Sequence, residues 1–172
     1  MRHHLAPILA VAAFAGAGPA LAQDATAQTG LIPMSRAMEI AQGSVNGGVL
    51  EAELETENGV QVYEIEIVQE AEVYEISVNA ETGEIVSKTE QRLESFVSGI
   101  FQDDELAAAQ AARGTLQQVL VDMEGKDGAR IEELSLDEED GRWLYEVEME
   151  DGNGRREVLV DATTGEIVSD DD

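Results

Sequence analysis

Residues 78–87 read VNAETGEIVS, and residues 160–169 read VDATTGEIVS. Working outward from this pair, residues 34–90 align with residues 116–172 at a constant shift of 82 positions, without a gap. The run YEIE at 63–66 then meets YEVE at 145–148, and Gly59 meets Gly141. The sequence therefore indicates an internal duplication, and we interpret each copy as one structural repeat.

Each copy combines a helical pattern with strand patterns. Three runs of alternating apolar residues, separated by turn residues such as Asn58-Gly59 and Asp140-Gly141, follow a helical stripe, and a short last strand follows the Thr-Gly-Glu turn. We therefore expect an α+β fold in which each repeat packs one helix on a three- to four-stranded antiparallel sheet. The stripe has apolar residues at i, i+3, i+4 and i+7, namely Met34, Ala37, Met38 and Ala41 in the first copy and Leu116, Val119, Leu120 and Met123 in the second.

The stretch between the copies, residues 91–113, is expected to be a helical connector. One stripe consists of Leu93, Phe96, Val97 and Ile100. A second helical segment runs from Leu106 through Ala112, with continuation past Gly114 into the Leu116 stripe as the alternative. A copy of about 57 residues is near the lower limit for a self-sufficient core, which favours two repeats packed together or a paired chain. The connector then belongs to the core between the repeats or forms an exposed helix that docks a partner.

The first 22 residues have the pattern of a signal peptide. Arg2 gives a positive start, residues 5–17 are small or apolar, and Ala20-Leu21-Ala22 has the small-x-small form of a cleavage site. We expect cleavage near Ala22 and a location in the periplasm or outside the cell. No other run reaches the roughly 20 apolar residues that span a bilayer, so we expect no membrane insertion. The expected organisation is a signal peptide at 1–22, a flexible segment at 23–30, the connector at 91–113, and repeats at 31–90 and 114–172.

The residue inventory argues against most catalytic chemistry. The chain has no cysteine, and both histidines, His3 and His4, leave with the signal peptide. Nucleophilic triads, zinc sites of histidine and cysteine, haem ligation and thiol redox motifs are thereby excluded. Carboxylates alone suffice for glycosidases, but that chemistry needs a deep cleft that two small units hardly offer. We therefore expect a protein that is not an enzyme and has no cofactor.

The charge limits the classes of partner. Acidic residues number 37 and basic residues 10, and loss of Arg2 leaves a net charge of −28. Such a surface repels nucleic acid and anionic lipid, and it favours a basic protein surface or a metal cation. Adaptation to salty surroundings, in which ions screen the self-repulsion, is the alternative explanation.

The order of elements and the repeated end motif resemble the PepSY domain family. The resemblance rests on the helix, the strands with Tyr-Glu-x-Glu, and the ending Val-Asx-Ala-x-Thr-Gly-Glu-Ile-Val, and it covers most of residues 31–90 and 114–172. It implies an exported module similar to part of a protease propeptide, which inhibits or regulates a peptidase or binds peptides, with no catalytic residues to carry over. Since no protease domain follows, inhibition would act on a separate protein. The departures are Asn79, where the family favours Asp, and Arg156, where the first copy has Tyr74.

The strand alternation predicts an acidic sheet face opposite the helices. This face is the candidate binding surface for an unknown protein, such as a peptidase, or for calcium, and a merely solvated outer face is the alternative. Trp143 is assigned to the same outward surface as an anchor, with burial between the repeats as the alternative. The residues of the candidate surface are Glu51, Glu53, Glu55, Glu64, Glu66, Glu75, Glu133, Asp137, Glu146, Glu148, Glu150, Glu157 and Trp143. The repeat signature is expected to be structural and consists of Tyr63, Thr82, Gly83, Glu84, Tyr145, Thr164, Gly165 and Glu166.

Overall fold

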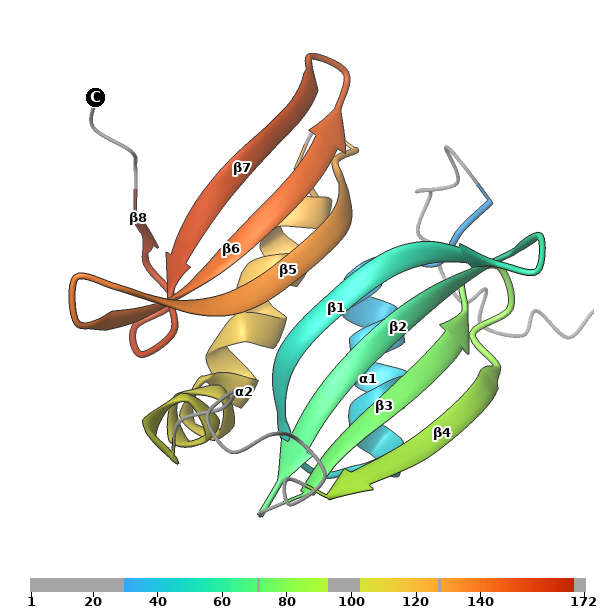
Figure 1. Ribbon diagram of the computed structural model, residues 1–172. Helices are drawn as coiled ribbons and strands as arrows, with labels where there is room; N and C mark the ends of the chain where they lie inside the picture. The colour runs from blue at the N-terminus through green and yellow to red at the C-terminus, as the bar shows by residue number, and fades with distance from the viewer. Residues whose placement is uncertain (1–29, 71, 93–102, 127, 169–172) are drawn as a thin grey trace, which may run out of the picture.

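The computed structural model describes residues 30–70, 72–92, 103–126 and 128–168 (Figure 1). The same order of elements occurs twice. The first half contains α1 (Met34–Ser44), β1 (Gly48–Glu57), β2 (Val60–Gln69), β3 (Glu72–Asn79) and β4 (Ile85–Arg92). The second contains α2 (Asp103–Glu124), β5 (Arg130–Glu139), β6 (Arg142–Asp151), β7 (Gly154–Asp161) and β8 (Ile167–Val168). The expected signal peptide and the stripe from Leu93 to Ile100 lie outside the described residues.

The α+β class is as predicted, but the strands do not form a separate sheet in each repeat. All eight belong to one antiparallel sheet, in the order β4-β3-β2-β1-β5-β6-β7-β8. The halves meet where β1 pairs with β5, over Glu51–Glu53 and Glu133–Ser135. Ala52 lies opposite Leu134, its own equivalent in the other repeat, so an approximate two-fold axis passes through this pair. Joining the sheets satisfies two strand edges that would otherwise be exposed.

Both helices lie on the same side of the sheet, behind it in Figure 1, and the hydrophobic core fills the space between. Each large aliphatic side chain buried there stabilises the fold by about 1.5–3 kcal/mol. Examples with at most 2% exposure are Met34, Met38, Ile65, Ile67, Ile76, Leu116, Leu120, Ile131, Leu134, Val147 and Met149. The buried Glu124 near the end of α2 accepts hydrogen bonds from the backbone N–H and hydroxyl of Ser35, and so ties the two helices together.

Helix α2 is longer than α1 because it begins well before Leu116, the equivalent of Met34. It runs without a break through Gly114, so residues 103–113 of the expected connector belong to the same helix as the Leu116 stripe. The added turns pack on the start of β1. A Cβ on Gly48 would lie 2.2 Å from the backbone carbonyl carbon of Ala109, so only glycine fits there.

The end motif folds into the same hydrogen-bonded turn in both repeats. The side-chain oxygens of Asn79 and Asp161 each accept hydrogen bonds from the backbone N–H groups of the residues two and three positions later. The donors three positions later are Thr82 and Thr164, both at 2.8 Å. Gly83 and Gly165 adopt φ of 73° and 72°, a conformation that glycine tolerates best. These contacts give Thr82, Gly83, Thr164 and Gly165 a role in the turn, and Glu84 and Glu166 close it through their backbone carbonyls.

The repeated tyrosines lie in the core with no exposed surface. The Tyr63 hydroxyl donates to the carbonyl oxygen of Ile32 at 2.8 Å, within its own repeat. The Tyr145 hydroxyl donates to that of Val49 at 2.7 Å and so bonds one repeat to the other. Within the described part of the chain, neither helix has the length and apolar character needed to cross a membrane.

Candidate functional site

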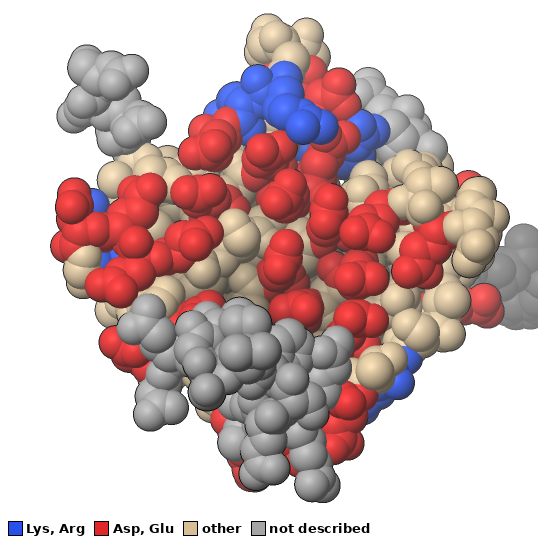
Figure 2. Space-filling model, viewed as in Figure 1, with Lys and Arg blue, Asp and Glu red and all other residues tan. Residues whose placement is uncertain are grey.

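The sheet side away from the helices carries the predicted carboxylates, which gather over both repeats in Figure 2. We call this surface the acidic face; it comprises Glu51, Glu53, Glu55, Glu64, Glu66, Glu75, Glu133, Asp137, Glu146, Glu148 and Glu157. The register places five of them directly opposite one another in a row across β2, β1, β5, β6 and β7, in the order Glu64, Glu53, Glu133, Glu148 and Glu157. A second row runs Glu75, Glu66, Glu51, Ser135 and Glu146.

Both rows place like charges side by side, an arrangement that destabilises a sheet by about 0.2–1 kcal/mol per pair. Partial burial, followed by the charges of Glu75, Glu55, Glu57 and Glu66, raises the pKa of Glu64 to about 7. Burial and neighbouring carboxylates also raise the pKa values of Glu51, Glu53, Glu66 and Glu146. Repulsion between the carboxylates therefore destabilises the folded protein, and a bound positive charge would reduce this repulsion.

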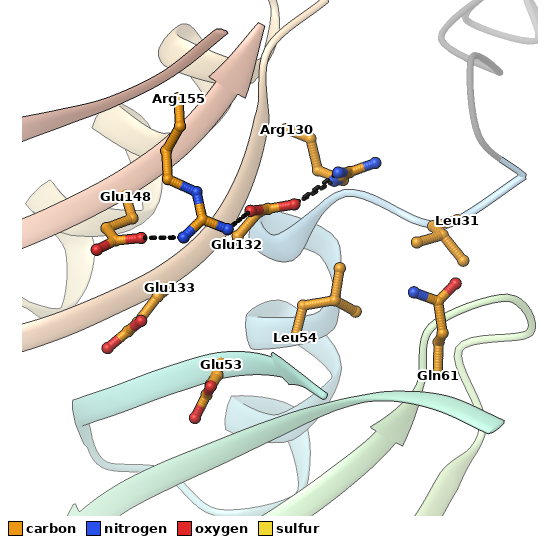
Figure 3. Close-up of a pocket in the computed structure, with 9 residues that line it drawn as sticks. All are labelled: Leu31, Glu53, Leu54, Gln61, Arg130, Glu132, Glu133, Glu148 and Arg155. Atoms are coloured by element: carbon orange, nitrogen blue, oxygen red, sulfur yellow. Dashed lines mark hydrogen bonds and ion pairs between the residues drawn. The ribbon is translucent and has the colours of Figure 1, made fainter. Parts of the chain in front are cut away.

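The second repeat adds a chain of ion pairs at the edge of this face. The Arg155 guanidinium bonds Glu132 at 2.6 Å and Glu148 at 3.1 Å, and Arg130 bonds Glu132 at 2.5 Å (Figure 3). Partial burial acts to raise the pKa of Glu132, but the hydrogen bonds and charges of the two arginines outweigh it and hold the pKa below the usual range.

A pocket of about 450 Å³ lies beside this ion-pair chain, between the two repeats. One wall comes from the first repeat and the other from the second, so the pocket exists only because the halves share a sheet. Its lining consists of Leu31, Glu53, Leu54, Gln61, Arg130, Glu132, Glu133, Glu148 and Arg155 (Figure 3).

One group of carboxylates has the spacing of a cation site. Oxygen atoms of Glu55, Glu57 and Glu64 all lie within 4.8 Å of one another, and all three side chains are half-buried. Oxygen ligands of this kind suit calcium, which takes six to eight of them. Among the residues that the structure describes, these three carboxylates are the group close enough together to coordinate one calcium ion.

The structure places the predicted glutamates together on one face, but the orientation assigned to Trp143 is wrong. Trp143 shares strand parity with the buried Tyr145, so its side chain lies on the helix side, where it packs against the core. Glu150 lies near the edge, opposite Arg155 and Arg130 rather than another acid. The sequence reasoning missed the pocket residues Leu31, Gln61, Arg130, Glu132 and Arg155. The aligned repeats could have indicated three of them, since Arg130, Glu132 and Arg155 are charged and their equivalents in the first repeat are glycine or apolar residues.

The comparison with protein-family profiles agrees with the duplication. The profile of the PepSY family, described as "Peptidase propeptide and YPEB domain", matches residues 31–89 and again residues 106–171. A crystal structure of a protein from Clostridium difficile 630, described as a candidate lipoprotein, has 15% sequence identity and a TM-score of 0.49, and the match covers 84% of this chain and 95% of that chain. No curated protein matches the sequence.

Proposed function

Because the chain belongs to the PepSY family, with two family domains in tandem, we propose that it is an exported, non-catalytic binding module. Its acidic face docks on a basic surface of a separate protein and thereby regulates that partner. A peptidase is the partner class that the family description favours. Export is supported by the signal-peptide pattern that ends at Ala22.

The five-carboxylate row supports this function most directly. It crosses the boundary between the repeats at the Glu53–Glu133 pair, so the two domains offer one continuous surface. Lysine or arginine side chains of a partner would neutralise carboxylates whose pKa values are already raised, and the net charge would speed the encounter. A partner with a basic patch is therefore bound in preference to a neutral one.

Charge reversal on this face tests the proposal. The double variant E64K/E66K is compared with E81K/E84K, which makes the same charge change at exposed positions of the turn. Each protein is used to capture partners from the native exported fraction, and the captured proteins are quantified by mass spectrometry and assayed for inhibited peptidase activity. We expect a basic protein that is enriched by the wild type and by E81K/E84K and is lost with E64K/E66K. Equal capture by both variants would contradict the role of the face.

A second candidate function, cation binding, is favoured by the cluster of Glu55, Glu57 and Glu64. Calcium at millimolar concentration would then raise the melting temperature of the wild type, and E64Q would remove the effect while the equivalent variant E146Q would keep it. Sodium chloride at matched ionic strength separates this from general salt adaptation, which predicts equal stabilisation by both salts. An unchanged melting temperature in calcium would exclude the site.

A further inference from the structure

The contact between the repeats leaves two gaps in the sheet, built from equivalent positions. Since β1 and β5 pair over only three residues, the strands diverge on either side of that contact, as Figure 1 shows. At one gap, the start of β1 (48–50) faces the end of β5 (136–139). At the other, the end of β1 (54–57) faces the start of β5 (130–132). The approximate two-fold axis relates one gap to the other.

The first gap is closed by apolar packing. Leu50 is 3% exposed, and Gly48 lies against the backbone of α2 at Ala109. Trp143, which pairs with Glu138 near the end of β5, packs against the core. We call this region the closed gap. It buries nonpolar side chains in the way that a protein interior normally does.

The second gap is the pocket described above, and we call it the open gap. Its residues Arg130, Glu132, Arg155 and Gln61 are the equivalents of Gly48, Leu50, Val73 and Trp143, in that order. At these four positions the open gap carries a polar or charged residue where the equivalent residue is apolar or glycine, whereas Leu54 of the open gap and its equivalent Leu136 are both apolar. Equivalent stretches of backbone therefore carry the buried Gly48 and Leu50 at one gap and border a charged pocket of about 450 Å³ at the other.

The charges of the open gap do not balance. Four glutamates and two arginines line it, which leaves a net charge of −2. Both arginines are already bonded to Glu132. Among the described residues, neither Glu53 nor Glu133 forms an ion pair with a basic side chain, although they lie opposite each other on adjacent strands. Leu54 and, farther along the pocket near Gln61, Leu31 add an apolar surface (Figure 3).

We propose that the open gap binds one lysine or arginine side chain of a partner polypeptide. The aliphatic part of that side chain packs on Leu31 and Leu54, and its cationic end lies between Glu53 and Glu133. The volume is within the range of about 300–1,000 Å³ typical of specific ligand pockets. The inference rests on the proposed function and deepens it, because it names the open gap as the position where the acidic face recognises a single basic side chain of the partner.

The test uses a pentapeptide with one arginine between alanine pairs, acetylated and amidated at its ends, titrated into the ¹⁵N-labelled protein while amide chemical shifts are recorded. Matched peptides carry neutral citrulline or aspartate in place of the arginine. The variant Q61W places at the open gap the residue that the closed gap uses, and E133Q removes one carboxylate without changing its shape. E66Q, the control, removes a carboxylate of the acidic face that does not line the pocket.

We expect the arginine peptide to shift the amides of Leu31, Leu54 and Gln61, with affinity lowered about tenfold or more by Q61W and E133Q and less than about twofold by E66Q. Thermal melts of the variants confirm that they are folded. Shifts spread over the acidic face, unchanged affinity in Q61W, equal binding of the citrulline or aspartate peptide, or absence of binding would each overturn the proposal. Shifts spread over the face would still leave the acidic face as the partner surface, so the two proposals fail separately.

Discussion

The two repeats share a backbone and a turn motif, yet they differ at positions on either side of their junction. At the closed gap the first repeat contributes the buried Gly48 and Leu50, with the buried Val73 two strands away on β3. Around the open gap the second repeat has Arg130, Glu132 and Arg155 at the equivalent positions. Positions that agree between the repeats, such as Tyr63 and Tyr145, maintain the fold. Positions that disagree are therefore the ones where function is to be sought.

The largest expected effect comes from filling the closed gap beyond its capacity. In G48A the new Cβ meets the helix α2 backbone at Ala109, which no side-chain rotation can relieve. We expect a loss of about 3 kcal/mol or more in the free energy of unfolding, at the upper end of overpacking effects. The equivalent variant R130A removes only partly exposed ion pairs and should lose less than about 1 kcal/mol. Urea denaturation measures both, and equal losses would contradict the difference between the gaps.

A smaller effect is expected at the two buried tyrosines. Y145F removes the hydroxyl that bonds Val49 across the repeats and leaves the buried carbonyl oxygen of Val49 without this donor, so we expect a loss of about 1–3 kcal/mol. Y63F removes a bond to Ile32, which is only half-buried, and should lose about 1 kcal/mol or less. The comparison is made from thermal melts at one pH. If Y63F proved the more damaging variant, the Tyr145 bond would not be a main link between the repeats.

The features that could be predicted from the sequence are those determined by local pattern. Alternating runs gave the strands, and the glycine turns such as Asn58-Gly59, where both residues have positive φ, gave their ends. The carboxylates of the acidic face followed from the same alternation. The outward orientation expected for Trp143 is wrong because Trp143 and the buried Tyr145 are two positions apart on β6 and therefore lie on the same side of the sheet.

The rest of the site depends on contacts that no local pattern encodes. The pairing of β1 with β5 joins strands that are distant in sequence, and nothing in either strand marks it as the partner of the other. The ion pairs of Arg155 with Glu132 depend on the register of three strands and on the bulge between Ile131 and Glu133. The pocket follows from both, so it appears only in three dimensions.

The smallest predicted effect concerns pH and compares Glu64 with its equivalent Glu146. The folded protein raises the pKa of Glu64 from 4.5 to about 7, mainly through burial and then through neighbouring carboxylates. The folded state thus binds this proton more tightly than the unfolded state, and the resulting stability is complete below the unfolded pKa and is lost as the pH rises through about 7. The variant E64Q, which stays neutral, should flatten the decline in melting temperature between pH 5 and pH 8.

Glu146 lies opposite Ser135, whereas Glu64 lies opposite Glu53, so the pKa of Glu146 is raised with one charged cross-strand neighbour fewer on that side. E146Q should therefore flatten the same decline less than E64Q does. Melting curves of the three proteins at fixed ionic strength measure the difference. Parallel curves for E64Q and the wild type would mean that the first repeat does not concentrate charge at Glu64. A bound cation or basic partner would then have no electrostatic preference for the first-repeat half of the acidic face.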